Sequence, residues 1–425
     1  MQIGRLFPGF SAPQKQITLS LGDNWRQFTL LVTVNLFVGG MIGMERSILP
    51  GLAEAEFGIT SKTAIVSFIA TFGLAKAATN LLAGNLTQRF SRRRILISGW
   101  LFAIPVPLIL IWAPSWGWVI GANVLLGINQ GLTWSMTVNM KMDLVGPRWR
   151  GVALGFNEAA GYLSLAAMAF LTGIIAESYG LRPEPFYLGI AISATALAFS
   201  ALLVRDTAPY LALENASRPG ATSVPLSLRR AFAEGTWRKP YLFGITQAGL
   251  AKNLNDGVAW GIFPLYFASQ GLELNRIAIL VAVYPLVWGI LQLATGWASD
   301  VLGRKPLIVS GMVLQGVAIS LTAAFDSFPV WIVTMSMLGF GTALVYPTLL
   351  AAIGDAVPAI DRATALGVYR FWRDSGFIFG ALLAGAFADL FGFSVAIQIV
   401  AALTVASGVV AQFTVRGKRA VVWAD

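Results

Sequence analysis

The loops GNLTQRFSRRR at residues 84–94 and GWASDVLGRKP at residues 296–306 begin two copies of one pattern, 212 residues apart in a chain of 425 residues. Identical residues continue at this spacing, without a gap, as far as Gly180 and Gly392. The repeated pairs include Gly84/Gly296, Arg92/Arg304, Gly127/Gly339, Asp143/Asp355, Arg150/Arg362 and Gly173/Gly385. The repeat predicts two like halves, which in a membrane protein can rock about a site held between them.

The composition places most of the chain in a membrane. Hydrophobic residues make up 56% and charged residues 12% of the sequence, whereas a soluble domain carries roughly 25% charged residues. Long apolar runs without polar–apolar alternation favour helices over a barrel. They occur near residues 27–49, 61–85, 94–113, 116–141, 151–175, 185–204, 240–268, 274–298, 306–325, 328–353, 363–388 and 391–415. We predict an all-α membrane protein, with twelve transmembrane helices in two pseudo-symmetric six-helix bundles.

The basic residues are distributed unevenly along this predicted bundle. The net charge is +10, and 21 of the 30 Lys and Arg residues fall in tails and loops of one side, against four on the other. This bias follows the positive-inside rule and predicts an inner-membrane protein with both termini in the cytoplasm. The basic charge therefore has a topological cause, and we expect no nucleic-acid partner.

Residue types missing from the chain exclude several kinds of chemistry. The sequence has no cysteine and no histidine, so it has no disulfide and no thiolate metal site. Residues 1–26 lack the apolar core of a cleaved signal peptide, so the first helix is expected to do the targeting. We expect no cofactor, no metal and no enzymatic activity.

One long polar segment separates the predicted halves. Residues 1–204 form the N-terminal half, residues 240–425 the C-terminal half, and residues 205–239 a linker rich in Pro, Gly and Ser. This composition is typical of a cytoplasmic connection between moving parts. Its portion LSLRRAFAEGTW (226–237) is interpreted either as an amphipathic helix on the inner leaflet or as a solvated loop.

The paired loops resemble the signature loop of the major facilitator superfamily, Gly-x-x-x-Asp-x-x-Gly-Arg-Lys/Arg. The second copy has Gly296, Asp300, Gly303, Arg304 and Lys305 at the matching places, whereas the first has Gln88 for Asp and Ser91 for Gly. The resemblance covers nearly the whole chain. It implies a twelve-helix secondary transporter in which loop charges close the inner side.

Within that resemblance, six loop charges are expected to act as a gate. The Arg of each loop can reach an acid at the end of another helix, and the Asp can accept from amides at a helix N-terminus. We expect a full set from Asp300, Arg304 and Asp355. A weaker set is expected from Asp143 with Arg92 or Arg93, because Gln88 is uncharged. The alternative is that these charges only hold topology.

Charged residues within the predicted helices are functional candidates, because burying an unpaired charge in a bilayer costs several kcal/mol. Glu45–Arg46 resembles the acid–Arg pair in helix 1 of organic-anion/proton symporters of the superfamily. The sequence leaves open whether this pair lies at the midplane of the bilayer or near its outer surface. Lys252 and Asp256 stand four apart in the predicted helix at residues 240–268 and share a face. They form either a substrate-contacting pair or a self-satisfied one.

The predicted helix at residues 363–388 carries a second set of charges. Arg370 and Asp374 are spaced to pair, which would leave Arg373 partly free. Glu158 is the repeat mate of Arg370, so the two could form an alternating gate or a static interfacial pair. Lys76 is a lone cation in the predicted helix at residues 61–85 and needs an acid or a carbonyl as a partner. Glu158 is a candidate.

These residues favour a monomeric carrier that moves a small organic anion or zwitterion by alternating access. Because histidine is absent, proton coupling would need a carboxyl group with a raised pKa. The candidates, in order, are Glu45, Glu158, Asp256 and Asp374, and sodium is the alternative coupling ion. A drug or metabolite efflux antiporter is the competing transport function. A non-transporting membrane sensor or assembly factor on the same fold is the competing class.

Overall fold

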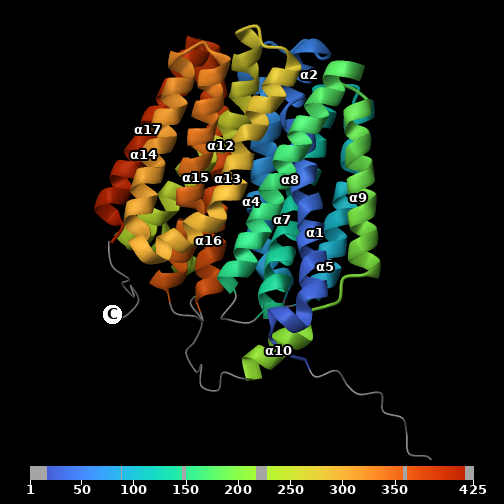
Figure 1. The fold of residues 1–425 in the computed structure, drawn as a ribbon, viewed down its shortest axis with the longest axis vertical. Helices are drawn as coiled ribbons and strands as arrows, with labels where there is room; N and C mark the ends of the chain where they lie inside the picture. The colour runs from blue at the N-terminus through green and yellow to red at the C-terminus, as the bar shows by residue number, and fades with distance from the viewer. Residues whose placement is uncertain (1–16, 88, 146–149, 217–226, 358–360, 417–425) are drawn as a thin grey trace, which may run out of the picture.

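The computed structural model describes residues 17–416, apart from residue 88 and residues 146–149, 217–226 and 358–360 (Figure 1). Every described element is a helix. The first helix begins at the bottom of the bundle in Figure 1, which we call the lower end of the molecule, and the last helix ends in the lower half of the picture. The opposite end is the upper end.

The N-terminal half contains six membrane-crossing segments, three of which are broken helices. Pro50 and Pro105 stand in the first turn after two of the breaks, because proline has no N–H to continue the helical hydrogen bonds. The broken segments are α1 (Leu21–Arg46) with α2 (Leu49–Ala55), α3 (Lys62–Ile65) with α4 (Ser67–Leu86), and α5 (Arg92–Ala103) with α6 (Pro105–Trp112). The others are α7 (Trp116–Val145), α8 (Arg150–Tyr179) and α9 (Glu184–Leu202).

The C-terminal half contains six continuous helices. Gly180 after α8 and its repeat mate Gly392 after α16 have φ of 104° and 83°, which glycine adopts without steric cost. The helices are α12 (Pro240–Ser269), α13 (Leu274–Leu302), α14 (Arg304–Ala324), α15 (Phe328–Ala356), α16 (Arg362–Phe391) and α17 (Phe393–Thr414). The linker contributes α10 (Ala208–Ala216), α11 (Leu228–Ala233) and a π-helical turn, η2 (Glu234–Arg238).

The predicted all-α membrane fold with two six-helix bundles is confirmed. Nine segments are long and apolar enough to cross a membrane, judged on the described residues alone. The other three crossing segments are formed by α4, α7 and α12, of which α7 and α12 are each 30 residues long. Those two bury charged side chains, Lys141 in α7 and Lys252 in α12, which lower their hydropathy.

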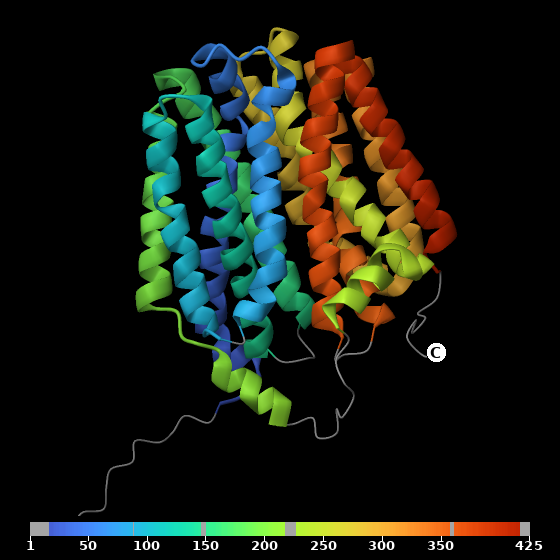
Figure 2. The same ribbon diagram turned by 180° about the vertical axis from the view of Figure 1, so that it is seen from behind.

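The two halves meet along α4 with α16 and along α8 with α13, as the view from behind shows for the first pair (Figure 2). The two halves approach each other closely in the upper part of the molecule. A Cβ added to Gly385 would lie 2.7 Å from the backbone of α3, and one added to Gly173 would overlap Ala278. Toward the lower end, a Cβ on Gly296 or Gly367 would meet no described atom within 4 Å. The halves are therefore packed tightly at the upper end.

Polar contacts across the halves reinforce the upper closure. The carboxylate of Asp389 in α16 accepts hydrogen bonds from the Ser61 hydroxyl at 2.8 Å and the Thr63 amide at 3.0 Å, at the start of α3. Glu177 of α8 accepts from the backbone amide of Asn275 in α13 at 3.1 Å. These bonds must break if the upper end opens.

Candidate functional site

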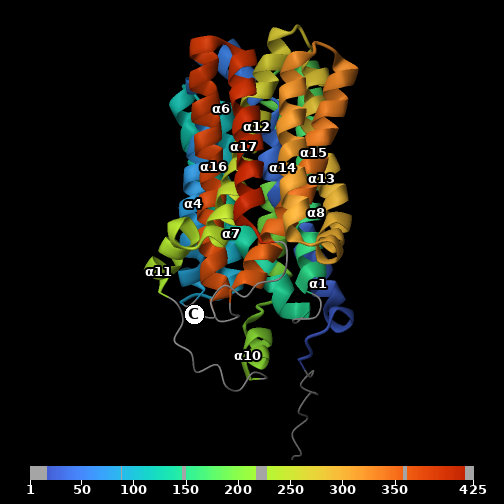
Figure 3. The ribbon, with the colours of Figure 1, turned by 90° about the vertical axis from the view of Figure 1, so that its left-hand side faces the viewer.

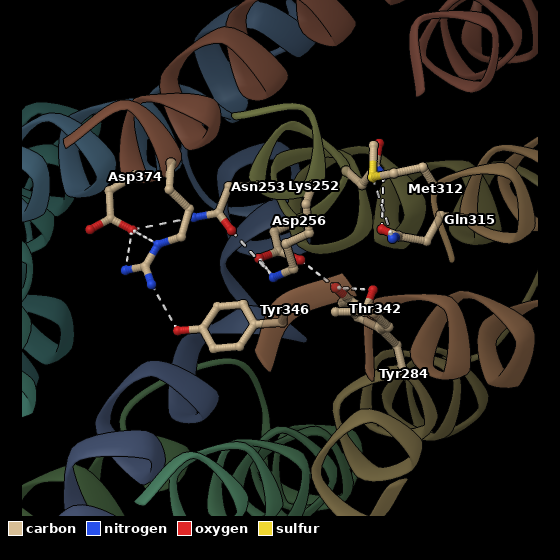
Figure 4. Close-up of polar contacts among 11 residues, drawn as sticks. Lys252, Asn253, Asp256, Tyr284, Met312, Gln315, Thr342, Tyr346 and Asp374 are labelled. Carbon is tan, nitrogen blue, oxygen red and sulfur yellow. Dashed lines mark hydrogen bonds and ion pairs between the residues drawn. The ribbon is translucent and has the colours of Figure 1, made fainter. Parts of the chain in front are cut away.

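Lys252 and Asp256 form a buried ion pair on α12. Nζ of Lys252 lies 2.7 Å from Oδ2 of Asp256, and both side chains are 1% exposed. The phenol of Tyr284 on α13 donates to Oδ1 of Asp256, and Oγ1 of Thr342 lies 3.3 Å from the same phenol oxygen (Figure 4). Both carboxylate oxygens therefore have partners, as a buried charge requires. The predicted pairing is confirmed.

Aromatic rings surround the Lys252 ammonium. Nζ lies 3.7 Å from the ring centroid of Trp288 and 5.1 Å from that of Tyr346, within the range of cation–π attraction. Trp288 stacks on Tyr162 of α8, with centroids 3.4 Å apart. Because α8 belongs to the N-terminal half, the ammonium lies close to the boundary where the halves meet.

Asp374 pairs with Arg373. Nε of Arg373 donates to Oδ1 of Asp374 at 2.8 Å, and Nη1 donates to the Tyr346 hydroxyl at 2.8 Å. Asn253 also donates to Asp374, at 3.3 Å, which links this pair to the Lys252 group (Figure 4). The prediction that Arg370 pairs with Asp374 is therefore wrong. The carboxylate turns toward Arg373 and Asn253 instead of lying along its own helix face.

Glu158 has neither of its predicted partners. Its Oε1 accepts from Nε1 of Trp134 at 2.9 Å and from Nδ2 of Asn157 at 3.1 Å. Neither Arg370 nor Lys76 forms an ion pair with it among the described residues. Oε2 of Glu158 is buried and has no hydrogen-bond partner there. The predicted Glu158–Arg370 and Glu158–Lys76 contacts are absent from this arrangement.

Lys76 is held by aromatic rings. Its Nζ lies 5.3 Å from the ring centroid of Trp134, 5.5 Å from that of Phe72 and 5.6 Å from that of Phe377. Phe377 belongs to α16, so this cation also lies at the contact between the halves. Trp134 touches both Lys76 and Glu158, and joins the two through its ring and its N–H.

Glu45 and Arg46 lie deep inside the molecule. Both side chains are fully buried, with Nη1 of Arg46 3.5 Å from Oε1 of Glu45. Asn123 donates to Oε2 of Glu45 at 3.2 Å. The guanidinium lies 4.8 Å from the ring of Phe72 and 5.4 Å from that of Trp260 on α12. The pair is therefore enclosed in the protein between the two halves.

The Arg46 guanidinium is unusual in its polar contacts. Among the described residues, none of its three nitrogens has a hydrogen-bond partner. A guanidinium carries five N–H donors, and leaving them buried without acceptors is costly. A site that keeps such donors without a partner is suited to an anionic ligand or to rearrangement during a cycle.

Two of the predicted gating pairs are formed at the lower end. Arg92 contacts Asp143 directly, and Nε of Arg304 lies 3.0 Å from Oδ2 of Asp355. Arg93 instead donates to the carbonyl of Ala201. Both pairs join helices of the same half, α5 with α7 and α14 with α15, so they organise each half internally.

The remaining gating residue is not placed by the structure. The side chain of Asp300, like Gln88 in the first loop, lies outside the described residues. Its predicted role therefore stays a prediction. Within the described residues, no group of three or more Asp, Glu, His or Cys side chains is arranged to hold a metal ion.

Sequence reasoning missed several residues of this central cluster. The aromatic ones look like ordinary core residues in an apolar helix, and only the packing of the halves brings them together. Asn80 and Asn123 carried a weak signal, because amides are uncommon in apolar helices. The missed residues are Asn80, Asn123, Trp134, Tyr162, Asn253, Tyr284, Trp288 and Tyr346.

Comparison with known proteins agrees with this architecture. The sequence profile described as "Major Facilitator Superfamily" matches residues 31–251 and 248–424. The quinolone resistance protein NorA of Staphylococcus aureus (strain MRSA252) is 28% identical over 137 residues, which is 32% of this chain and 35% of NorA. The match thus spans about a third of that relative.

A second relative matches over a longer stretch. A probable 4-methylmuconolactone transporter of Cupriavidus pinatubonensis is 24% identical over 328 residues, covering 75% of this chain and 71% of the relative.

Solved structures share the fold. The human organic anion transporter MFSD10 superposes with a TM-score of 0.69 at 15% identity, covering 91% of this chain and 99% of that one. A POT family transporter bound to a thioalcohol-conjugated peptide superposes with a TM-score of 0.72 at 13% identity, covering 91% of this chain and 95% of that one. The profile match over nearly the whole chain, on a fold of two six-helix bundles, shows that this protein belongs to the major facilitator superfamily.

Proposed function

We propose that this transporter carries a small organic anion or zwitterion across the inner membrane by alternating access, coupled to protons. The observation that carries the proposal is a cluster of cations at the interface between the two halves, which we call the seam. Lys252, Arg373 and Lys76 all lie beside aromatic rings there. Lys76 lies beside rings of both halves, and the ring beside Lys252, Trp288, stacks on Tyr162 of the other half. A carboxylate placed among them would be held by either half in turn.

The buried acids support proton coupling. Glu45 and Asp256 each share a buried ion pair with a cation of the same helix. An anionic substrate that draws Arg46 or Lys252 away would leave the acid without its counterion, which favours its protonation. Proton and substrate would then move together, as in a symporter. Sodium coupling is the alternative for the same acids.

The charge bias supports an orientation for this cycle. The lower end carries the start of α1 and the linker helices α10 and α11, and α17 ends toward it. The positive-inside rule assigns that end to the cytoplasm. The structure then corresponds to a state closed to the outside.

Transport by the purified protein in proteoliposomes tests the proposal. Counterflow of a panel of labelled organic acids reports substrate recognition without any ion gradient. Uptake under an imposed pH gradient, a sodium gradient or neither then identifies the coupling ion. Counterflow of one or more acids, with uptake raised by an inward proton gradient, is the expected result. No counterflow of any acid or amino acid would favour the non-transporting alternative.

Efflux remains the second candidate function, because one relative is named as a quinolone resistance protein. An antiporter would accumulate an organic cation or neutral drug in inside-out vesicles when the interior is acidified. Such accumulation, with no response to organic acids, would replace the symport proposal.

A further inference from the structure

A hollow of about 620 Å³ lies outside the central cluster, at the lower end. Leu81 of α4 forms one side, and Phe232, Trp237, Arg229 and Arg238 of α11 and η2 form much of the rest. Figure 3 shows α11 on the outer surface of the bundle, beside the lower part of α4. The hollow is thus a surface feature of the linker and the N-terminal half.

The linker wall of this hollow is attached to the C-terminal half. The ring of Phe232 lies 5.8 Å from that of Phe371 and 5.7 Å from that of Trp372, both on α16. Nε1 of Trp372 donates to the Thr236 hydroxyl at 3.0 Å. Because Leu81 belongs to the other half, a molecule in the hollow would touch both halves at once.

The lining combines apolar surface with positive charge. Trp237 and Leu228 are 63% and 45% exposed, and the residues around the hollow include two arginines and no acid. Arg230 on the same turn is different, because its Nε lies 3.0 Å from Oε1 of Glu234. Exposed Trp beside Arg is typical of the boundary between lipid headgroups and acyl chains.

We propose that this hollow binds one phospholipid with an anionic headgroup. Arg229 and Arg238 would hold the phosphate and the headgroup charge, and Leu81, Phe232 and Trp237 would cover the upper part of an acyl chain. The apolar walls favour a lipid over a free phosphate, which would use only the two arginines. The lipid would join α4 to the linker and so favour the arrangement of the halves seen here. This site is independent of the transported substrate.

Native mass spectrometry of the full-length protein, titrated with phosphatidylglycerol or phosphatidylcholine of identical chains, tests the proposal. We expect phosphatidylglycerol to bind more tightly. The double variant Arg229→Gln/Arg238→Gln should lose that preference, with each removed charge weakening binding roughly fivefold. Arg230→Gln is the matched control: it removes a charge from the same helix, keeps a donor for Glu234, and should bind like the wild type.

Three outcomes would overturn the proposal. The first is equal affinity of the wild type for both lipids. The second is equal loss in the double variant and in Arg230→Gln, which would indicate only general surface charge. The third is displacement of the lipid by inorganic phosphate at comparable concentration, which would mean a plain anion site. Thermal unfolding of each variant without lipid separates a folding defect from a binding defect.

Discussion

Asn80 of the N-terminal half donates a 2.5 Å hydrogen bond to Oδ2 of Asp374 in the C-terminal half. The Ser135 hydroxyl donates to Oδ1 of the same amide at 2.9 Å and so fixes its orientation. The bond joins α4 to α16 at the seam where the halves must separate. It therefore contributes to the balance between the states of the cycle.

Asn80→Ala should shift that balance away from the observed state. A hydrogen bond to a charged group contributes roughly 1.5–3 kcal/mol to stability. In the variant, Asp374 keeps its hydrogen bonds from Arg373 and Asn253. Because the chain has no cysteine, Val66→Cys offers a single reporter, buried at the upper seam. Its labelling from the upper side should rise at least severalfold in the variant. Thr71→Ala, which removes a hydroxyl bonded only within α4, should leave labelling unchanged.

Gly173→Ala should weaken the upper closure by steric means. The added Cβ would overlap Ala278 across the seam, so α8 and α13 must move apart. The repeat-related helix offers the control Gly367→Ala, where the new Cβ meets no described atom within 4 Å. Labelling of Val66→Cys should increase in the first variant only. An equal response in both would mean that the seam does not set the closure.

The Arg304–Asp355 pair should act through its charges. Its side chains are 11% and 26% exposed, so the pair contributes on the order of 1 kcal/mol to stability. Asp355→Asn should therefore reduce transport more than it lowers the melting temperature. The exchanged variant Arg304→Asp/Asp355→Arg should recover part of the transport lost in Asp355→Asn. If the exchanged variant recovers no transport, the individual side chains at positions 304 and 355 matter, and the pairing of their charges does not.

Topology can be tested with single cysteines at the two ends. Ser115, exposed between α6 and α7, should react with a membrane-impermeant reagent added outside the cell when changed to Cys. Ser227→Cys, at the start of α11, should react only after the membrane is opened. The reverse pattern would place the termini outside and contradict the charge bias.

Features that depend on spacing within a helix or on the repeat could be predicted from the sequence. The Lys252–Asp256 pair follows from a four-residue spacing, and Arg304–Asp355 from the repeated loop. The depth of Glu45–Arg46 could not be judged by counting from the helix start. The chain continues upward as α2 after a break at Ser47 and Ile48, so the pair ends α1 without ending the membrane-crossing segment.

Features that depend on how the halves pack could not be predicted. Asp374 lies four residues from Arg370, yet its carboxylate is drawn to Arg373, Asn253 and Asn80 from three directions. Trp288 sits in an apolar helix, where the sequence pattern is the same whether the ring faces lipid or the seam. Only the contact of α8 with α13 brings it onto Tyr162 and beside Lys252.

Counterflow by the double variant Lys252→Met/Asp256→Asn, normalised to the protein inserted in the membrane, tests the central claim most directly. Removing both charges leaves neither buried and unpaired, so the variant should fold and insert. The single change Asp256→Asn would strand the Lys252 charge, which is strongly destabilising, and serves as the folding comparison. If the cluster binds an organic anion, the double variant is present in normal amounts and its counterflow is lost. Counterflow near the wild-type rate would contradict the account and leave Arg46 and Arg373 as the anion-binding candidates.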